Sequence, residues 1–178
     1  NHGNKKNQNV YMDTCVMKTE LFISLVREAK KLSSMYTLAD ILNDKCETLD
    51  IRGVAHKGFF ASITDFPSYY AANMDLLDYK AAQELFHENW PIYTRTNDSC
   101  PTQYFDTAEV KNSVISNGCQ IEGTVENSVI GRGCVIKKGA VVRNSVVLAE
   151  VTVGEDVHVE NEVVDKWAKL IHKKEIIS

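Results

Sequence analysis

The sequence predicts a mixed fold, in which an incomplete α/β segment precedes a left-handed parallel β-helix built from hexapeptide repeats. Aliphatic residues recur about every six positions from 115 to 159, a period that matches neither an ordinary strand nor a helix. Glycines fall at a fixed place in the repeat, where a bend is expected. The leading aliphatic residues are Ile115, Ile121, Ile130, Ile136, Val142, Val147, Val153 and Val159.

Each hexad predicts one flat side of a triangular coil, with its leading Ile or Val pointing inward. Four positions later a second inward slot lies near a corner and has room for a small side chain. Several coils have to stack, because each buries its aliphatic residues only against its neighbours. Irregular steps at 122–127 and 144–145 are interpreted as adjustments at corners. The small slot holds Cys119, Cys134, Ala140 and Val157, and the bend before it holds Gly118, Gly133 and Gly139.

The N-terminal part carries signals for a few helices and strands, too few for a complete α/β sheet. Strands are expected at Val10–Met17 and Thr48–Arg52, with Val54–Phe60 as a partner. Helices are expected from Thr19, which can cap one, at Leu38–Leu42, after Pro67 and at Lys80–His87. The expected organisation is therefore an α/β nucleotidyltransferase-like part at 1–88, an extended connector at 89–107 and the β-helix at 108–178.

Composition is that of an ordinary globular protein, with 178 residues, 44% hydrophobic residues and a net charge of −4. This charge gives no reason to expect nucleic acid or an anionic membrane as a partner. No apolar run is long enough to span a bilayer and no signal segment opens the chain, so a cytoplasmic location is expected. The five cysteines lack disulfide or zinc spacing and are expected to be reduced. The chain begins at Asn1 without Met, which favours a processed or excised piece of a longer protein.

Three phrases in this order resemble bacterial glucose-1-phosphate adenylyltransferase: Ser68–Leu77, Trp90–Arg95 and Val125–Gly133. The resemblance runs from about Val10 to Asp165. It implies a Rossmann-like nucleotidyltransferase domain joined to a left-handed β-helix, and formation of ADP-glucose from ATP and glucose 1-phosphate with Mg²⁺ in glycogen synthesis. This chain would be the second half of such a protein, because nothing in it resembles the glycine-rich nucleotide loop.

The chain departs from the family at a phrase just before the Ser68 helix. Where the resemblance implies an Arg and a metal-binding Asp, this sequence has Ala61 and Ser62. A serine hydroxyl brings no negative charge to a divalent ion, and alanine brings no guanidinium to a phosphate. No catalytic residue and no metal ligand is therefore expected here, and Mg²⁺ is expected only in a catalytic partner. The departure resembles the GlgD-type subunit, the regulatory partner of a catalytic GlgC-type subunit.

Several basic residues are candidates for binding a sugar-phosphate or phosphate effector, as the family's effector sites lie near the junction of its domains. A solvated charged face and a structural ion pair are the competing interpretations. The candidates are Arg95, Arg132, Lys137, Lys138 and Arg143. Oligomerisation is expected through the β-helix, whose end coil has unpaired backbone groups.

The function predicted is a regulatory and assembly subunit, not catalytic or weakly active, of glucose-1-phosphate adenylyltransferase. One alternative is a catalytically active member in which other residues replace the lost carboxylate. A second alternative is a hexapeptide acyltransferase that uses the outward-facing His158 as general base.

Overall fold

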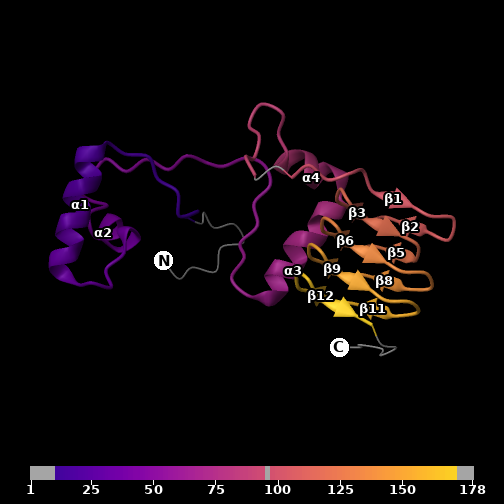
Figure 1. Cartoon of the computed structure of the whole chain (residues 1–178). Helices are drawn as coiled ribbons and strands as arrows, with labels where there is room; N and C mark the ends of the chain where they lie inside the picture. Colours follow the sequence, from indigo (N-terminus) through magenta and orange to yellow (C-terminus); the bar gives the residue numbers. More distant parts are fainter. Residues whose placement is uncertain (1–10, 95–96, 172–178) are drawn as a thin grey trace, which may run out of the picture. The chain divides into compact units, whose positions relative to one another are not determined.

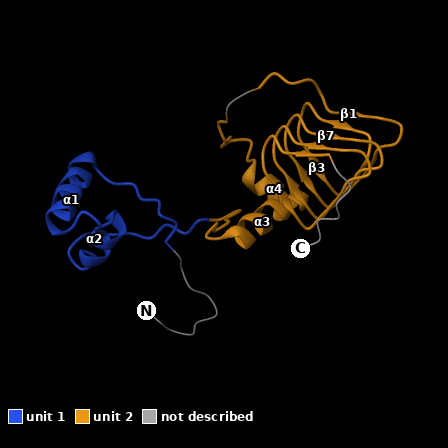
Figure 2. Cartoon of the chain, turned by 60° about the horizontal axis from the view of Figure 1, so that its bottom comes forward, with its two compact units in different colours: residues 1–56 blue, residues 57–178 orange. Residues whose placement is uncertain are grey.

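The computed structural model describes residues 11–94 and 97–171 and divides the chain into two compact units, residues 1–56 and 57–178 (Figure 2). The first unit holds α1 (Thr19–Leu32) and α2 (Leu38–Asp44). The second holds α3 (Phe66–Met74), the short 3₁₀ helix η1 (Asp75–Leu77), α4 (Tyr79–Leu85) and thirteen short strands among the residues described. None of the described helices is long and apolar enough to cross a membrane.

The strands form three parallel sheets, and successive strands pass from one sheet to the next (Figure 1). The first sheet contains β1 (Gln103–Tyr104), β4 (Gln120–Ile121), β7 (Val135–Ile136), β10 (Thr152–Val153) and β13 (Lys169–Leu170). The second contains β2 (Glu109–Lys111), β5 (Thr124–Glu126), β8 (Val141–Arg143) and β11 (His158–Glu160). The third contains β3 (Val114–Ile115), β6 (Val129–Ile130), β9 (Val146–Val147) and β12 (Val163–Val164). The predicted parallel β-helix is confirmed.

Leading aliphatic residues and small-slot residues together fill the interior of the β-helix. The leading residues from Ile121 to Val159 are fully buried, as are the small-slot residues Cys119, Cys134, Ala140 and Val157. Val125 is an inward residue that the six-residue pattern misses. The corner between Ile121 and Val125 is two residues shorter than the corresponding corners of the neighbouring coils. Thr124 accordingly pairs with Glu109, 15 residues before it, and with Val141, 17 residues after it.

The bends have the backbone that the sequence predicts. Gly118, Gly133 and Gly139 have φ values of 80°, 66° and 76°, in the region that favours glycine. A different corner uses asparagine instead, because Asn112, Asn127 and Asn144 have φ values between 43° and 46°. Asparagine tolerates this conformation better than most other residues with a Cβ. The three asparagines follow in-register strands of the second sheet, so they stack along one edge of the β-helix.

The first unit is a small helical pair rather than part of a sheet. The predicted helices are present, and Leu25, Ala29 and Ile41 form their buried core. Lys18, and not Thr19, occupies the cap position of α1, and it makes no side-chain capping bond. Helix α2 is instead capped by Thr37, whose hydroxyl accepts from the Asp40 N–H.

The three strands predicted before residue 61 are wrong where the structure describes them. The ranges 11–17, 48–52 and 54–60 contain no strand. An alternating sequence forms a strand only if a neighbouring strand accepts its backbone hydrogen bonds, and the described part of this unit offers no such neighbour. The side chains of Val16 and Val54 are accordingly exposed.

The expected boundaries at 88 and 107 stay predictions. The division between the compact units falls at 56/57, and β1 at Gln103–Tyr104 lies within the stretch expected to be a connector. Helices α3 and α4 therefore belong to the same unit as the β-helix.

Gly123 tests the tight corner, because a Cβ there would lie 2.7 Å from the Lys137 carbonyl oxygen and closer still to that of Ala140. We expect Gly123→Ala to lower the free energy of unfolding by about 1–3 kcal/mol, the usual cost of overpacking. Chemical denaturation followed by circular dichroism measures it. Gly53→Ala is the matched control, since a Cβ there meets nothing within 4 Å. Equal midpoints for the two variants would contradict the predicted clash.

Candidate functional site

The segment that departs from the family lies directly before α3. Ala61 is half-buried and Ser62 is exposed, and both have irregular backbone. The nearest carboxylate, Asp65, caps α3: its Oδ1 accepts from the Ser68 N–H at 2.8 Å, and the Ser68 hydroxyl accepts from the Asp65 N–H at 3.0 Å. Hydrogen bonds from the side chain and backbone of Ser68 hold the pKa of Asp65 below its ordinary value. Asp65 therefore has a structural role at the start of the helix.

Helix α3 connects this segment to the outside of the β-helix. It contacts β9 (Figure 1), and the Tyr70 hydroxyl donates to the Asn144 carbonyl oxygen at 2.6 Å. Val146 on β9 is only 1% exposed although it lies outside the interior cluster. An outward-facing valine is buried in this way only if another element covers it, and α3 is the element in contact. The segment at 61–65 is thus anchored next to this sheet.

The basic candidate residues are distributed over different parts of the β-helix. Arg132 stands at one corner, where its carbonyl oxygen accepts from the Glu150 N–H at 2.8 Å. Lys137 and Lys138 stand at the next corner, where the Lys138 carbonyl oxygen accepts from the Asp156 N–H at 3.3 Å. Arg143 ends β8. Arg95 lies outside the described residues. The structure therefore does not bring the four described residues to one point, and their role in effector binding stays a prediction.

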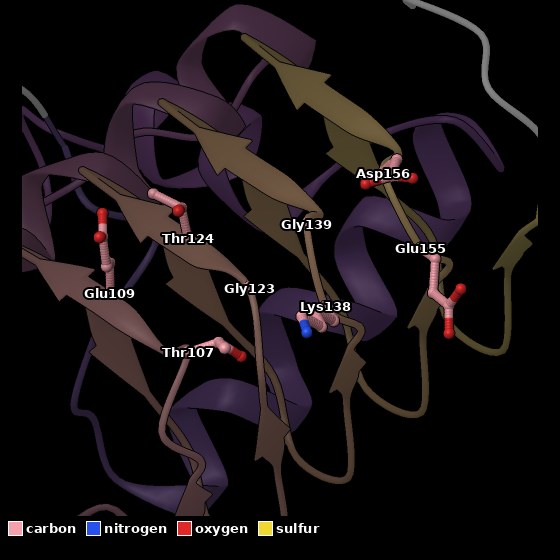
Figure 3. Close-up of a pocket in the computed structure, with 8 residues that line it drawn as sticks. All are labelled: Thr107, Glu109, Gly123, Thr124, Lys138, Gly139, Glu155 and Asp156. Atoms are coloured by element: carbon pink, nitrogen blue, oxygen red, sulfur yellow. The ribbon is translucent and has the colours of Figure 1, made fainter.

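Lys138 borders a depression on the second sheet (Figure 3). Its volume is about 530 Å³, and Figure 3 displays the side chains that line it: Thr107, Glu109, Thr124, Lys138, Glu155 and Asp156, with Gly123 and Gly139. Three carboxylates and one ammonium give the lining a net negative charge, which disfavours a phosphate at this place. Among the residues that the structure describes, no group of three or more His, Cys, Asp or Glu side chains is placed to hold a metal ion.

Arg143 takes part in an ion-pair network across three coils. Its Nε lies 3.4 Å from Glu126 Oε2, and Lys111 Nζ lies 3.2 Å from Glu126 Oε1. These three residues are register neighbours on β2, β5 and β8. Lys111, and to a lesser extent Arg143, holds the pKa of Glu126 below its ordinary value. The guanidinium of Arg143 is therefore largely compensated by a neighbour within the sheet.

His158 begins β11 and is exposed. Its register neighbour on β8 is Val141. A histidine that acts as general base is usually oriented by a second polar group, and the strand beside it supplies an aliphatic side chain at this position.

The first described coil exposes apolar side chains at positions whose equivalents in the next coil are buried. Tyr104 is 54% exposed and Val110 is 40% exposed, whereas their register neighbours Ile121 and Val125 are 0% exposed. Within the described part of the chain no strand lies beyond β1, β2 or β3 in its sheet. Unpaired strand edges next to apolar side chains are suited to association with another chain. Sequence reasoning expected such an end but did not identify these residues, which fall before the clearest repeats.

The Glu126 network predicts a pH-dependent contribution to stability. Because the folded-state pKa of Glu126 is lowered, its stabilisation is present above the unfolded-state pKa and is lost as pH falls through the folded-state value. We expect Glu126→Gln to have a lower denaturation midpoint than the original chain at neutral pH, and the two midpoints to converge in acid. Glu88→Gln, at an exposed position, is the control. A difference that persists well below the carboxyl range would exclude the ionic explanation.

Comparison with known proteins gives one family model over the repeats. Residues 101–177 match the model described as GlmU-like, C-terminal hexapeptide. This match begins two residues before β1 and includes all of the described strands.

Curated relatives match a larger share of the chain. The glycogen biosynthesis protein GlgD of Geobacillus stearothermophilus is 36% identical over 131 residues, which are 74% of this chain and 38% of that protein. The glucose-1-phosphate adenylyltransferase of Fervidobacterium nodosum is 33% identical over 79% of this chain and 34% of its own length. GlgD of Bacillus subtilis is 34% identical over 58% of this chain and 30% of its own length.

The chain spans between 30% and 38% of the length of these relatives. The resemblance that the three sequence phrases indicated is confirmed, and the match includes proteins of both names. The chain is therefore related to the family of glucose-1-phosphate adenylyltransferases and GlgD proteins, over a portion that includes a C-terminal hexapeptide β-helix.

Proposed function

We propose that this chain is the C-terminal portion of a GlgD-like subunit that acts in glycogen biosynthesis without carrying out the adenylyl transfer itself. The observation that carries the proposal is the pair Ala61 and Ser62, which stands where the resemblance implies an arginine and a metal-binding aspartate. Charge that develops on a phosphoryl group in the transition state has to be neutralised by positioned cations. Neither alanine nor serine contributes to this.

The surroundings of Ser62 support the same conclusion. Asp65 is the nearest acid in the chain, and it is engaged in the cap of α3. Recruiting it for a metal ion would remove the hydrogen bond to the Ser68 N–H and weaken the helix start. The residues present therefore do not fit a Mg²⁺ site. Magnesium belongs, in this proposal, to a catalytic GlgC-type partner in the cytoplasm.

The proposed role of the subunit is to assemble with the catalytic subunit and to bias its conformation. A subunit that performs no chemistry can still change a partner's activity if it binds one of two conformations better, and such coupling is typically about 1–3 kcal/mol. The end of the β-helix at Tyr104 and Val110 supports a docking role, because it combines unpaired edges with exposed apolar side chains. Effector binding by the basic corner residues is also part of this proposal, and an anionic effector would compete with Glu126 for Arg143 and with the neighbouring carboxylates for Lys138.

The two alternatives make different demands on the chain. A catalytic family member would need another carboxylate near Ser62, and Asp65 is already used as a cap. An acyltransferase would need a polar partner for His158, whose register neighbour is Val141. Neither alternative is favoured by a specific observation.

Activity measurements test whether the proposed subunit lacks adenylyltransferase activity. The protein to be tested is a polypeptide that contains this chain and has the full length of a GlgD protein. We expect it to form no ADP-glucose from ATP and glucose 1-phosphate with Mg²⁺. We expect it to alter the rate when a catalytic subunit is added. ADP-glucose release, quantified by chromatography, measures both. Turnover by the polypeptide alone, with a rate abolished by Asp65→Asn, would instead establish the catalytic alternative.

Assembly through the exposed coil is tested by Val110→Glu, which places a charge among the apolar side chains of this edge. We expect the dissociation constant for the catalytic subunit to rise at least about tenfold, as expected for a buried unpaired charge at an interface. Val54→Glu is the matched control because Val54 is exposed outside the β-helix. Circular dichroism checks that the β-helix persists. Unchanged affinity of a folded Val110→Glu variant would rule out this edge as the docking surface.

A further inference from the structure

Two cysteines occupy the same small slot in consecutive coils. Cys119 and Cys134 are both buried, and each follows a glycine with positive φ. The coils are in register next to them, because Gln120 pairs with Val135 and the Gln120 N–H donates to the Cys134 carbonyl oxygen at 2.9 Å. Neighbouring strands lie about 4.8 Å apart. This spacing falls within the range of about 4.4–6.8 Å that a disulfide requires between Cα atoms.

The two thiols lean in the same direction along the stack. The Cys119 thiol donates to the Gly131 carbonyl oxygen at 3.1 Å, in the coil of its partner. The Cys134 thiol donates to the Leu148 carbonyl oxygen at 3.1 Å, in the following coil. Cys119 therefore already points toward the coil of Cys134, and Cys134 has to rotate about χ1 to meet it. Formation of a disulfide would break these two weak thiol–carbonyl hydrogen bonds.

The two thiols are chemically unequal. The neighbouring Cys134 side chain lowers the pKa of Cys119, and the proximity of Cys119, together with burial, raises the pKa of Cys134. The thiolate is the form that reacts with oxidants. Cys119 is therefore suited to react first. Once Cys119 is a neutral sulfenic acid, it no longer carries the charge that raises the pKa of Cys134, and Cys134 can then act as the resolving thiol.

We propose that Cys119 and Cys134 are a peroxide-sensitive pair that forms a cross-strand disulfide between the second and third coils. The Cys119 thiolate attacks one oxygen of hydrogen peroxide, which gives a sulfenic acid and releases hydroxide. The Cys134 sulfur then attacks the Cys119 sulfur, the S–OH bond breaks and water leaves. In total, two thiols lose two electrons and two protons, and one peroxide becomes two waters.

The position of the pair determines how an oxidant reaches it. Cys119 lies one coil from the exposed end, and the Thr102 hydroxyl of the first coil accepts from its N–H at 3.2 Å. Opening of this first coil would expose Cys119 before any deeper residue, so reaction should accompany local opening. Hydrogen peroxide suits such a site because it is small and uncharged. The resulting disulfide closes a loop of 15 residues and resists fraying of this end.

Peroxide treatment of the full chain tests the pair. The exposed cysteines Cys15, Cys46 and Cys100 are first replaced by serine. The folded protein is then treated with hydrogen peroxide, quenched, unfolded in an alkylating reagent and mapped by mass spectrometry. We expect a cross-linked peptide pair containing Cys119 and Cys134 that is 2 Da lighter than the two free-thiol peptides. We also expect reversal by dithiothreitol and a higher melting temperature for the oxidised protein.

Cys134→Ala is the matched control, because Ala140 fills an equivalent buried slot on the next side of the coil. In this variant we expect a sulfenic acid at Cys119 that dimedone traps, with no cross-link and no rise in melting temperature. Two outcomes would overturn the proposal. In one, both thiols remain alkylatable after prolonged treatment of the folded protein. In the other, Cys119 is oxidised to sulfinic acid in the original pair without any cross-link to Cys134.

Discussion

The structure depends on one constraint, the in-register stacking of short parallel strands with an aliphatic side chain on the inner face of each. A coil of this kind has no core of its own, since its inward residues are buried only by the coils on either side. The fully buried Ile121 has a register neighbour on both sides, whereas the half-exposed Tyr104, at the equivalent place in the first described coil, has one on a single side. The end of a β-helix is consequently the place where apolar surface and unpaired backbone occur together, and it requires a covering element or a partner.

A corner of the β-helix shows how polar groups are accommodated within this stack. Ser128 Oγ donates to the Glu126 carbonyl oxygen and accepts from the Ser145 N–H, and Ser145 Oγ repeats this toward Glu162. These buried hydroxyls accept hydrogen bonds from the Ser145 and Glu162 N–H groups at the bend. The asparagine before each serine, Asn127 or Asn144, has positive φ and turns the chain. The Asn144 carbonyl oxygen accepts from the Tyr70 hydroxyl. The same corner therefore closes each coil and anchors α3 to the outside of the sheet.

The sequence predicts the β-helix well because its interior repeats one steric requirement, and it predicts the first unit less well. Glycine at 118, 133 and 139 and small residues after them follow from local geometry alone. Val125 escapes the pattern, because the corner at Gly123 is two residues shorter than the corresponding corners of the neighbouring coils. The strands expected before residue 61 depend on neighbours that local alternation cannot reveal. The burial of Val146 depends on α3, which lies more than 70 residues away along the chain.

In the candidate site, the residues that hold the local fold differ from the residues at the positions implied to be catalytic. Helix α3 keeps its cap through Asp65 and Ser68, its proline at the first turn and its anchor at Tyr70. None of these contacts involves Ala61 or Ser62, so the segment can hold its place beside the β-helix with neutral side chains at both positions. In the proposed function, the charged pair can therefore be absent from this segment without loss of the fold.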